Sequence, residues 1–341
     1  MSDALKALAE VSARIGAERL LVQGPGGNTS IKLGDELWVK GSGVWLAEAS
    51  QRQIFTCVSL QQVRRRLAAG EAEDLSDTAL PKADPGLRPS IETCLHALMP
   101  HPVVVHAHAV GAMTTSVLAD GEARAAAALE GLRWAWVPYR RPGSPLADLI
   151  AEILQRGAAD VLILENHGVV VGADTPDAAE ALLREVEQCL ALPERACAAA
   201  DGATLSATET PLYEALIDAS GVALDGELTA ALAAAPLFPD QVVFVGGAAP
   251  TLRSGETLDA ASERIHAISG VTPAMVLAPG VGVFGLRART RAADSVIQGL
   301  MDVAVRLPPG AAVRGLPDGA IPALLNWDAE TYRQKLAQAG G

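Results

Sequence analysis

The sequence is poor in cysteine, in aromatic residues and in long apolar runs, and each shortage excludes a class of protein. Its 4 cysteines are widely spaced without a C-x-x-C pair, which excludes a zinc ribbon or a dithiol redox motif and favours reduced, mostly buried thiols. No stretch approaches the roughly 18 uninterrupted apolar residues of a membrane span. Aromatic residues make up 4% of the chain, so its helices are expected to pack on small side chains such as alanine.

Basic residues are also in deficit, since 27 Lys and Arg face 40 Asp and Glu and leave a net charge of −13. This sign does not suit a protein that grips a phosphate backbone or an anionic bilayer, so we expect neither a nucleic-acid nor a membrane partner. The first 21 residues alternate charge with Ala and Leu at helical spacing and lack the pattern of a secretory peptide. We therefore expect a cytoplasmic protein that acts on a small molecule.

Turn residues and apolar periodicity divide the 341 residues into elements. Helices are predicted over 2–18, 91–99, 121–132, 145–156 and 176–191, and strands over 29–33, 36–40, 103–108, 134–137 and 160–164. The polar, proline-rich segment 70–89 predicts a long surface loop. A composition shift at 198–210 marks the best domain boundary, which gives domains over 1–205 and 206–341.

The second half partly repeats the first. At an offset of 114 residues, segment 161–180 lies over segment 275–294, and both show an apolar strand, a glycine, a short apolar run and a helix start. His167 is matched by Val281, so the second half lacks a metal ligand at that place. We interpret the C-terminal half as a degenerate relative of the first.

Histidine positions indicate a metal site. His106 and His108 stand at i and i+2, which on a strand puts both rings on one face, about 6.5–7 Å apart along the backbone. His167 ends another apolar strand and is the candidate third ligand, and three histidines leave the fourth position of a catalytic zinc open. Glu92 begins the helix before the His106 strand and is the candidate acid/base, with a pKa raised toward neutrality in a dry pocket.

The His-x-His pair also fits other interpretations. A solvated strand face is one, but the preceding run of three valines favours burial. Cupins also use such a pair, but they need a glutamate shortly after it, and segment 109–113 contains none. A carbonic-anhydrase-like hydrolase with three histidines stays open on spacing alone.

Five motifs follow one another along the first half of the chain: Gly27-Asn28-Thr29-Ser30, Lys40-Gly41-Ser42-Gly43, Arg88-Pro89-Ser90-Ile91-Glu92, Val105-His106-Ala107-His108 and Asn166-His167-Gly168. In order and spacing they resemble the class II aldolase/adducin family, whose enzymes include fuculose-phosphate and rhamnulose-phosphate aldolases. The resemblance covers roughly the first 200 residues and is more specific than any one motif alone.

The resemblance implies a three-layer α/β/α sandwich in which His106, His108 and His167 bind Zn²⁺ or another divalent metal such as Mn²⁺. It makes Glu92 the general acid/base and gives Tyr139 the role of protonating the leaving aldehyde in the site of a neighbouring subunit. It implies that the substrate phosphate is held by Gly27, Asn28, Ser30, Ser42, Gly43 and Ser90. Glycine-rich turns suit that role because they expose backbone N–H groups to an anion.

The resulting hypothesis is a metal-dependent lyase, a homodimer or homotetramer, that cleaves a small hydroxylated keto compound such as a sugar phosphate by a retro-aldol reaction. Its zinc would stabilise an enediolate. Ile91 replaces a serine of the family pattern, which weakens the case for a phosphorylated substrate. A decarboxylase, dehydratase or epimerase of the same family is an alternative, and a non-catalytic adducin-like interaction module is another. His96 and His101 match no ligand and are interpreted as helix-face and loop residues.

Overall fold

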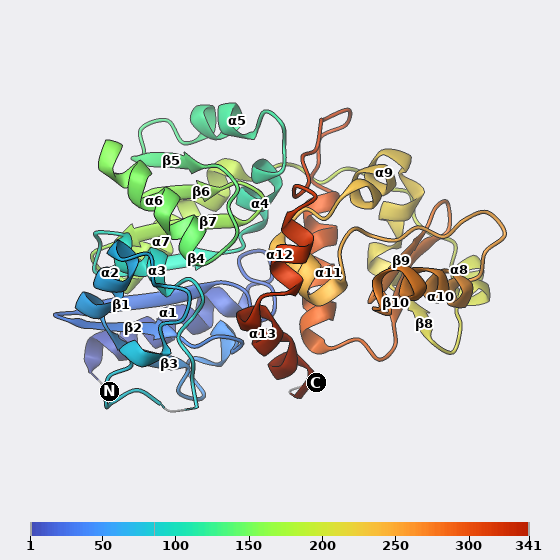
Figure 1. The fold of residues 1–341 in the computed structure, drawn as a ribbon. Helices are drawn as coiled ribbons and strands as arrows, with labels where there is room; N and C mark the ends of the chain where they lie inside the picture. The colour runs from blue at the N-terminus through green and yellow to red at the C-terminus, as the bar shows by residue number, and fades with distance from the viewer. Residues whose placement is uncertain (1, 85, 340–341) are drawn as a thin grey trace. The chain divides into compact units, whose positions relative to one another are not determined.

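The computed structural model describes residues 2–84 and 86–339, which divide into two compact units (Figure 1). Unit 1 comprises residues 2–116 and 121–191, and unit 2 comprises residues 117–120 and 192–339. Unit 2 begins ahead of the predicted boundary at 206 because Arg195 already bonds within it, through its N–H to Val305 O and its guanidinium to Asp225. Positions 1 and 341 of the predicted domain limits, and Pro85 of the predicted loop, lie outside the described residues.

A seven-stranded sheet in the order β3-β2-β1-β4-β7-β6-β5 forms the centre of unit 1. Neighbouring strands are antiparallel except for the parallel pair β5 and β6. The strands are β1 Asn28–Leu33, β2 Glu36–Lys40, β3 Phe55–Ser59, β4 Val103–Ala107, β5 Trp134–Val137, β6 Val161–Leu164 and β7 Gly168–Ala173.

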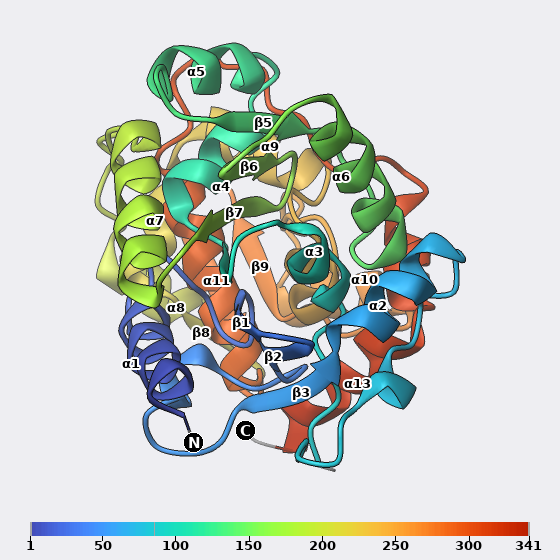
Figure 2. The same cartoon turned by 90° about the vertical axis from the view of Figure 1, so that its left-hand side faces the viewer.

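Helices cover both faces of this sheet, with α1 and α7 along one face and α2, α3 and α6 on the other (Figure 2). The three-layer α/β/α arrangement expected from the resemblance is therefore confirmed. The helices of unit 1 are α1 Asp3–Ala17, α2 Leu60–Ala68, α3 Thr93–Leu98, α4 Val110–Ser116, α5 Gly121–Ala128, α6 Ser144–Arg156 and α7 Pro176–Leu190, with 3-10 turns η1 Leu46–Glu48 and η2 Ser76–Thr78.

Strand β4 shows why the sheet lies in the middle layer. Val103 and Val105 belong to the apolar cluster under α1 and α7, whereas Val104 belongs to the cluster under α3 and α6. All three are fully buried, and each such side chain stabilises the fold by roughly 1.5–3 kcal/mol. The continuous valine run thus reflects a strand covered on both faces, and it delivers the next residue, His106, into the interior.

Two of the predicted helices have an end more than one residue from its expected position, and α2 and α4 were not predicted. The helix predicted over 91–99 begins at Thr93, because Ser90 closes a turn in which its carbonyl accepts from Thr93 N and its hydroxyl from Glu92 N. Glu92 therefore occupies the N-cap position, which a helix beginning at residue 91 would have given to Ser90. The helix predicted over 121–132 ends at Ala128, shortly before Gly131 adopts a φ of +89°.

Unit 2 contains a three-stranded antiparallel sheet in the order β8-β10-β9. Its strands are β8 Tyr213–Ala215, β9 Met275–Ala278 and β10 Gly282–Leu286. Its helices are α8 Gly202–Thr208, α9 Gly226–Ala234, α10 Leu258–Ser269, α11 Arg291–Ala304, α12 Ala320–Leu325 and α13 Asp328–Ala339, with a 3-10 segment η3 Ile217–Leu224 and a π-helical turn η4 Gln241–Val245.

The repeat seen in the sequence corresponds to one local unit, an antiparallel hairpin followed by a helix. In both copies a glycine opens the second strand and a threonine caps the helix, Thr175 for α7 and Thr290 for α11. Thr290 falls one residue later than the offset of 114 puts it. The sheets otherwise differ, with seven strands against three, so descent of the whole second unit from the first stays a prediction.

A short piece of chain inside the first half, Val117–Asp120, belongs to unit 2. Ala119 N donates to Ala312 O, Arg314 N donates to Val117 O, and Leu118 pairs with Val313. We call this the exchange of Val117–Asp120 into unit 2, because the residues on both sides of it belong to unit 1. Sequence composition did not predict it.

The cysteine side chains are all free thiols. Cys57 and Cys94 are buried, but Cys189 is exposed and Cys197 is half-buried, so the expectation of mostly buried thiols is correct for two of them only. None of the helices in the described ranges is long and apolar enough to cross a membrane.

Candidate metal centre and active site

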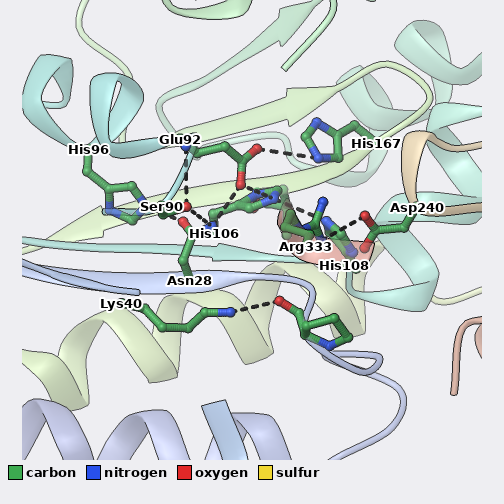
Figure 3. A network of polar contacts seen from close by, with 12 residues as sticks. Asn28, Lys40, Ser90, Glu92, His96, His106, His108, His167, Asp240 and Arg333 are labelled. Carbon is green, nitrogen blue, oxygen red and sulfur yellow. Dashed lines mark hydrogen bonds and ion pairs between the residues drawn. The ribbon is translucent and has the colours of Figure 1, made fainter. Parts of the chain in front are cut away.

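Three histidine side chains meet at adjoining ends of the central sheet of unit 1. His106 lies near the end of β4, His108 directly follows that strand, and His167 lies in the turn between β6 and β7. Because β4 and β7 are antiparallel neighbours, the end of β4 adjoins the start of β7. The three rings are buried, and one ligand nitrogen from each lies within 4.8 Å of the others (Figure 3).

The donor set fits a divalent metal. Nδ1 of His106 donates to Val169 O over 3.0 Å, which leaves Nε2 with a lone pair facing the other rings. Nε2 of His106 and Nε2 of His108 are 3.2 Å apart. A tetrahedral zinc ion with bonds of about 2.0–2.1 Å holds its ligand atoms about 3.4 Å apart. These residues can therefore hold a metal ion with a coordination position left open.

The backbone around His167 is specialised for this meeting. Asn166 has a φ of +54°, and it is the one residue other than glycine with positive φ in the part of the chain that the structure describes. Asparagine tolerates this left-handed conformation better than most residues. A Cβ on Gly168 would lie 2.4 Å from Ala107 O, so only glycine lets the start of β7 lie this close to β4. The Asn-His-Gly sequence is thus a packing requirement as well as a ligand motif.

Glu92 faces the open side of the triad. Its Oε2 lies 3.4 Å from His106 Nε2, and its Oε1 lies 3.4 Å from His167 Nε2. Burial alone would raise the pKa of this carboxyl, but the neighbouring rings of His106 and His167, together with the hydrogen bond from Asn28, lower the pKa to about 2. The expected rise toward neutrality is therefore wrong, because the sequence did not show how many imidazole rings and hydrogen-bond donors would surround one carboxylate.

Asn28 and Ser90 adjoin this carboxylate, as Figure 3 shows. Asn28 pairs with His106 across β1 and β4, and its Nδ2 donates to Glu92 Oε2 over 2.7 Å and to Ser90 Oγ over 3.2 Å. Ser90 Oγ also accepts from Glu92 N over 3.3 Å. Since the Ser90 oxygen accepts twice, its own proton can be donated to a third group.

The other predicted substrate-binding residues lie in two glycine turns. Gly27 has a φ of +62°, and a Cβ there would lie 2.9 Å from His106 O, so this turn packs closely against β4. Ser42 N donates to Arg88 O over 2.9 Å, which joins the turn containing Gly43 to the segment that leads to Ser90. The structure thus ties both turns to the segments that carry His106 and Glu92.

Ser30 is placed differently from these residues. It is fully buried, and its hydroxyl shares a 2.7 Å hydrogen bond with Nδ1 of His96. The expected role of Ser30 in holding a phosphate finds no support in this geometry, since its side chain is engaged inside the protein.

Tyr139 lies in the loop that follows β5. Its N–H donates to Glu165 Oε2 over 2.9 Å, so the loop is attached to the turn that bears His167. The hydroxyl is buried without a hydrogen-bond partner among the described residues, and burial raises its pKa to about 12. The phenol keeps its proton at neutral pH. The neighbouring Arg141 pairs with Glu73 over 2.8 Å.

His96 is the residue that the sequence interpretation missed. It is fully buried in α3, burial lowers its pKa to about 3, and its two ring nitrogens contact Ser30 Oγ and Asn28 Oδ1. Its position four residues after Glu92 was a usable signal, because residues at i and i+4 share a helix face. His101, by contrast, pairs with Asp160 over 2.8 Å, in keeping with a loop residue outside the triad.

Residues 6–192 match the family described as the Class II Aldolase and Adducin N-terminal domain. The chain belongs to this family. A curated relative, the uncharacterized oxidoreductase YuxG of Bacillus subtilis (strain 168), is 32% identical over 194 residues, which is 51% of this chain and 28% of YuxG. The chain thus spans well under half the length of that relative.

Solved structures also align with this chain. The N-terminal class II aldolase domain of a conserved protein from Thermoplasma acidophilum is 26% identical, with a TM-score of 0.48, over 55% of this chain and 92% of that one. The L-fuculose-1-phosphate aldolase from Thermus thermophilus is 17% identical, with a TM-score of 0.38, over 55% of this chain and 91% of that one.

Proposed function

We propose that the protein is a metal-dependent lyase that cleaves a small hydroxylated keto compound, such as a sugar phosphate, by a retro-aldol reaction. The observation that carries this proposal is the Glu92 carboxylate, whose two oxygens lie 3.4 Å from ring nitrogens of His106 and His167. A proton-transfer group beside an open three-histidine site is what cleavage next to a carbonyl requires.

His106, His108 and His167 would hold zinc or another divalent metal, which when bound would supply a Lewis acid for the negative charge that develops on substrate oxygens as the bond breaks. Glu92 is ionised at rest, so in the synthetic direction it takes a proton from the carbon next to the carbonyl. In the cleavage direction one proton passes the other way: the substrate hydroxyl loses it as the aldehyde forms, and the Glu92 carboxyl, protonated in that exchange, delivers a proton to the carbon next to the carbonyl. Asn28 and Ser90 hold Glu92 in place for both transfers.

The two glycine turns and Ser90 are the proposed substrate anchors. The Ser90 hydroxyl proton, together with backbone N–H groups near Gly27 and Gly43, suits a phosphate or carboxylate on the substrate. Tyr139 is the proposed acid in the synthetic direction, in which its phenol gives a proton to the aldehyde oxygen as the carbon–carbon bond forms in the site of a second copy of the chain. Its raised pKa keeps the phenol protonated at neutral pH.

Decarboxylation, dehydration and epimerisation could use the same residues, because these reactions differ from aldol cleavage in which substrate bond breaks. The word oxidoreductase in the name of YuxG describes a protein of which the alignment spans 28%. An interaction module without catalysis would have no use for three converging histidines and a buried glutamate.

The deciding experiment measures metal content and cleavage together. Purified full-length protein should hold about one divalent ion per chain by elemental analysis, and the zinc-loaded protein is screened against phosphorylated and unphosphorylated ketoses and keto acids. The Glu92→Gln variant should keep its metal and lose roughly 10²–10⁴-fold in kcat. The matched control is Glu152→Gln, on the exposed face of α6, which should retain full activity. Absence of metal after zinc addition, or unimpaired turnover in Glu92→Gln, contradicts the proposal.

A further inference from the structure

A buried chain of hydrogen bonds runs from Ser30 to Glu92 through His96 and Asn28. Ser30 Oγ lies 2.7 Å from His96 Nδ1, His96 Nε2 contacts Asn28 Oδ1, and Asn28 Nδ2 donates to Glu92 Oε2 over 2.7 Å. The four side chains come from two elements, β1 and the start of α3. None of them is more than 6% exposed, so water does not compete for these bonds.

The position of each hydrogen in this chain follows from chemistry. An ionised carboxylate only accepts, so the NH₂ group of Asn28 must face Glu92 and the Asn28 carbonyl must face His96. The carbonyl in turn requires a donor, so His96 carries its proton on Nε2. A neutral His96 then has an acceptor at Nδ1, which takes the hydroxyl proton of Ser30. One tautomer alone satisfies every contact.

This arrangement disfavours rotation of the Asn28 amide by half a turn, which would weaken its contact with Glu92. If the Asn28 amide turned over, its oxygen would face the Glu92 carboxylate, and the two would repel each other. With its proton on Nε2, His96 also disfavours that orientation, since Nε2–H would then face an NH₂ group. The carboxylate and the buried imidazole thus favour the same orientation of Asn28.

We propose that His96 is a positioning residue that fixes the Asn28 amide and, through it, the carboxylate of Glu92, with Ser30 bonded to the second ring nitrogen of His96. The mechanistic part of this inference rests on the proposed role of Glu92 in proton transfer. The competing role for His96 is that of a core side chain whose own hydrogen bonds are satisfied without any effect on Glu92.

The hydrogen-bond arrangement is tested without reference to catalysis. Zinc-loaded full-length protein labelled with ¹⁵N-histidine, and with ¹⁵N in asparagine side chains, is studied by NMR at pH 6–8. We expect His96, identified by the loss of its signal in His96→Gln, to carry a proton on Nε2 and none on Nδ1. The Asn28 amide protons should exchange slowly with water. A proton on Nδ1, or an Asn28 amide equally protected in His96→Leu, overturns the proposal.

The effect on Glu92 is tested by the exchange of carbon-bound protons of 1,3-dihydroxyacetone and its phosphate ester in D₂O. His96→Leu should lower kcat roughly 10–100-fold, with KM and zinc content little changed, because small displacements of a reacting group cost rates of that order. His96→Gln places an amide donor near the position of Nε2 and should restore most of kcat. The control His101→Gln alters a nearby histidine outside the network and should behave as wild type.

Ser30→Ala separates two roles for that serine. If Ser30 holds the His96 ring in place, kcat falls and KM for the phosphate ester stays constant, whereas loss of a phosphate anchor would raise KM. Equal kcat in His96→Leu and wild type refutes positioning. Absence of exchange in zinc-loaded wild type refutes the proposed function instead, and the Asn28 amide protection still decides whether His96 holds Asn28.

Discussion

At Gly168, beside the candidate metal centre, a single added methyl group would clash with the neighbouring strand. Its Cβ in Gly168→Ala would lie 2.4 Å from Ala107 O, and that backbone atom cannot rotate away. We expect β7 to move away from His108, with weaker zinc binding and a loss of about 1–3 kcal/mol in the free energy of unfolding. Zinc titration and urea unfolding of the variant measure the two effects.

A matched control for this substitution is Gly157→Ala, just after α6. Gly157 has extended backbone, with a φ of −175°, and no atom lies within 4 Å of its would-be Cβ. Zinc affinity and stability should stay near wild type there. If Gly168→Ala is equally harmless, the close approach of β7 to β4 does not constrain the site.

The sequence predicted which histidines would meet, but it did not predict the surroundings of Glu92. His106 and His108 share a strand, and strand periodicity is sufficient to place them together. The pKa of Glu92 depends on charges and donors that arrive from β1, β4 and the β6–β7 turn, and no local pattern counts these. His96 was missed for the same reason, since its partners lie on another element.

At the scale of the element, strand β1 carries a half-buried lysine whose contribution to stability depends on pH. Lys32 Nζ donates to Met99 O and His101 O, each over 2.6 Å, and burial lowers its pKa from 10.5 to about 7. The unfolded chain therefore binds more protons than the folded chain between pH 7 and 10.5, so Lys32 makes the free energy of unfolding rise with pH across that window.

Replacement of this side chain by an apolar one should remove the effect. We expect the free energy of unfolding of wild type, minus that of Lys32→Met, to increase steadily from about pH 7 to pH 9.5, as measured by urea unfolding. Lys6→Met, on the exposed face of α1, should show a constant difference. A flat profile for Lys32→Met would mean that the two carbonyls keep the ammonium protonated throughout.

The type of an element was predictable where its own segment of sequence carried a local signal. The valine run of β4 and the Thr175-Pro176 start of α7 each carry a local signal, and both elements lie where expected. The start of α3 was misplaced because Ser90 is a preferred N-cap residue. Its carbonyl and hydroxyl instead close a turn ahead of the helix, and Asn28 binds the Ser90 and Glu92 side chains from another strand.

At the scale of the whole molecule, the exchange of Val117–Asp120 into unit 2 limits how the chain can be divided. Val117 and Leu118 are at most 1% exposed, and their strand partners lie at 312–314. We expect a fragment ending at 191 to expose both side chains and to aggregate more than the full chain, as measured by light scattering. The double replacement Val117→Ser and Leu118→Ser should reduce that aggregation.

The same double replacement in the full-length chain serves as the control, because it should destabilise a protein in which both side chains are buried. A fragment that stays monomeric without any replacement contradicts the prediction. Nothing in the sequence predicted this exchange, since composition marks boundaries along the chain and cannot mark a piece that packs with residues far beyond its own segment.

The packing of Val117–Asp120 with unit 2 also has a consequence during synthesis. Arg314, whose guanidinium donates to Ala119 O, lies 195 residues beyond it. A ribosome adding about 5–20 residues per second needs roughly 10–40 s to cover that distance. Throughout this interval Val117 and Leu118 wait without their strand partners, however quickly unit 1 has formed. In the nascent chain these two apolar residues therefore stay without their partners until the second half has been synthesised, and the speed of its translation sets how long they need protection from aggregation.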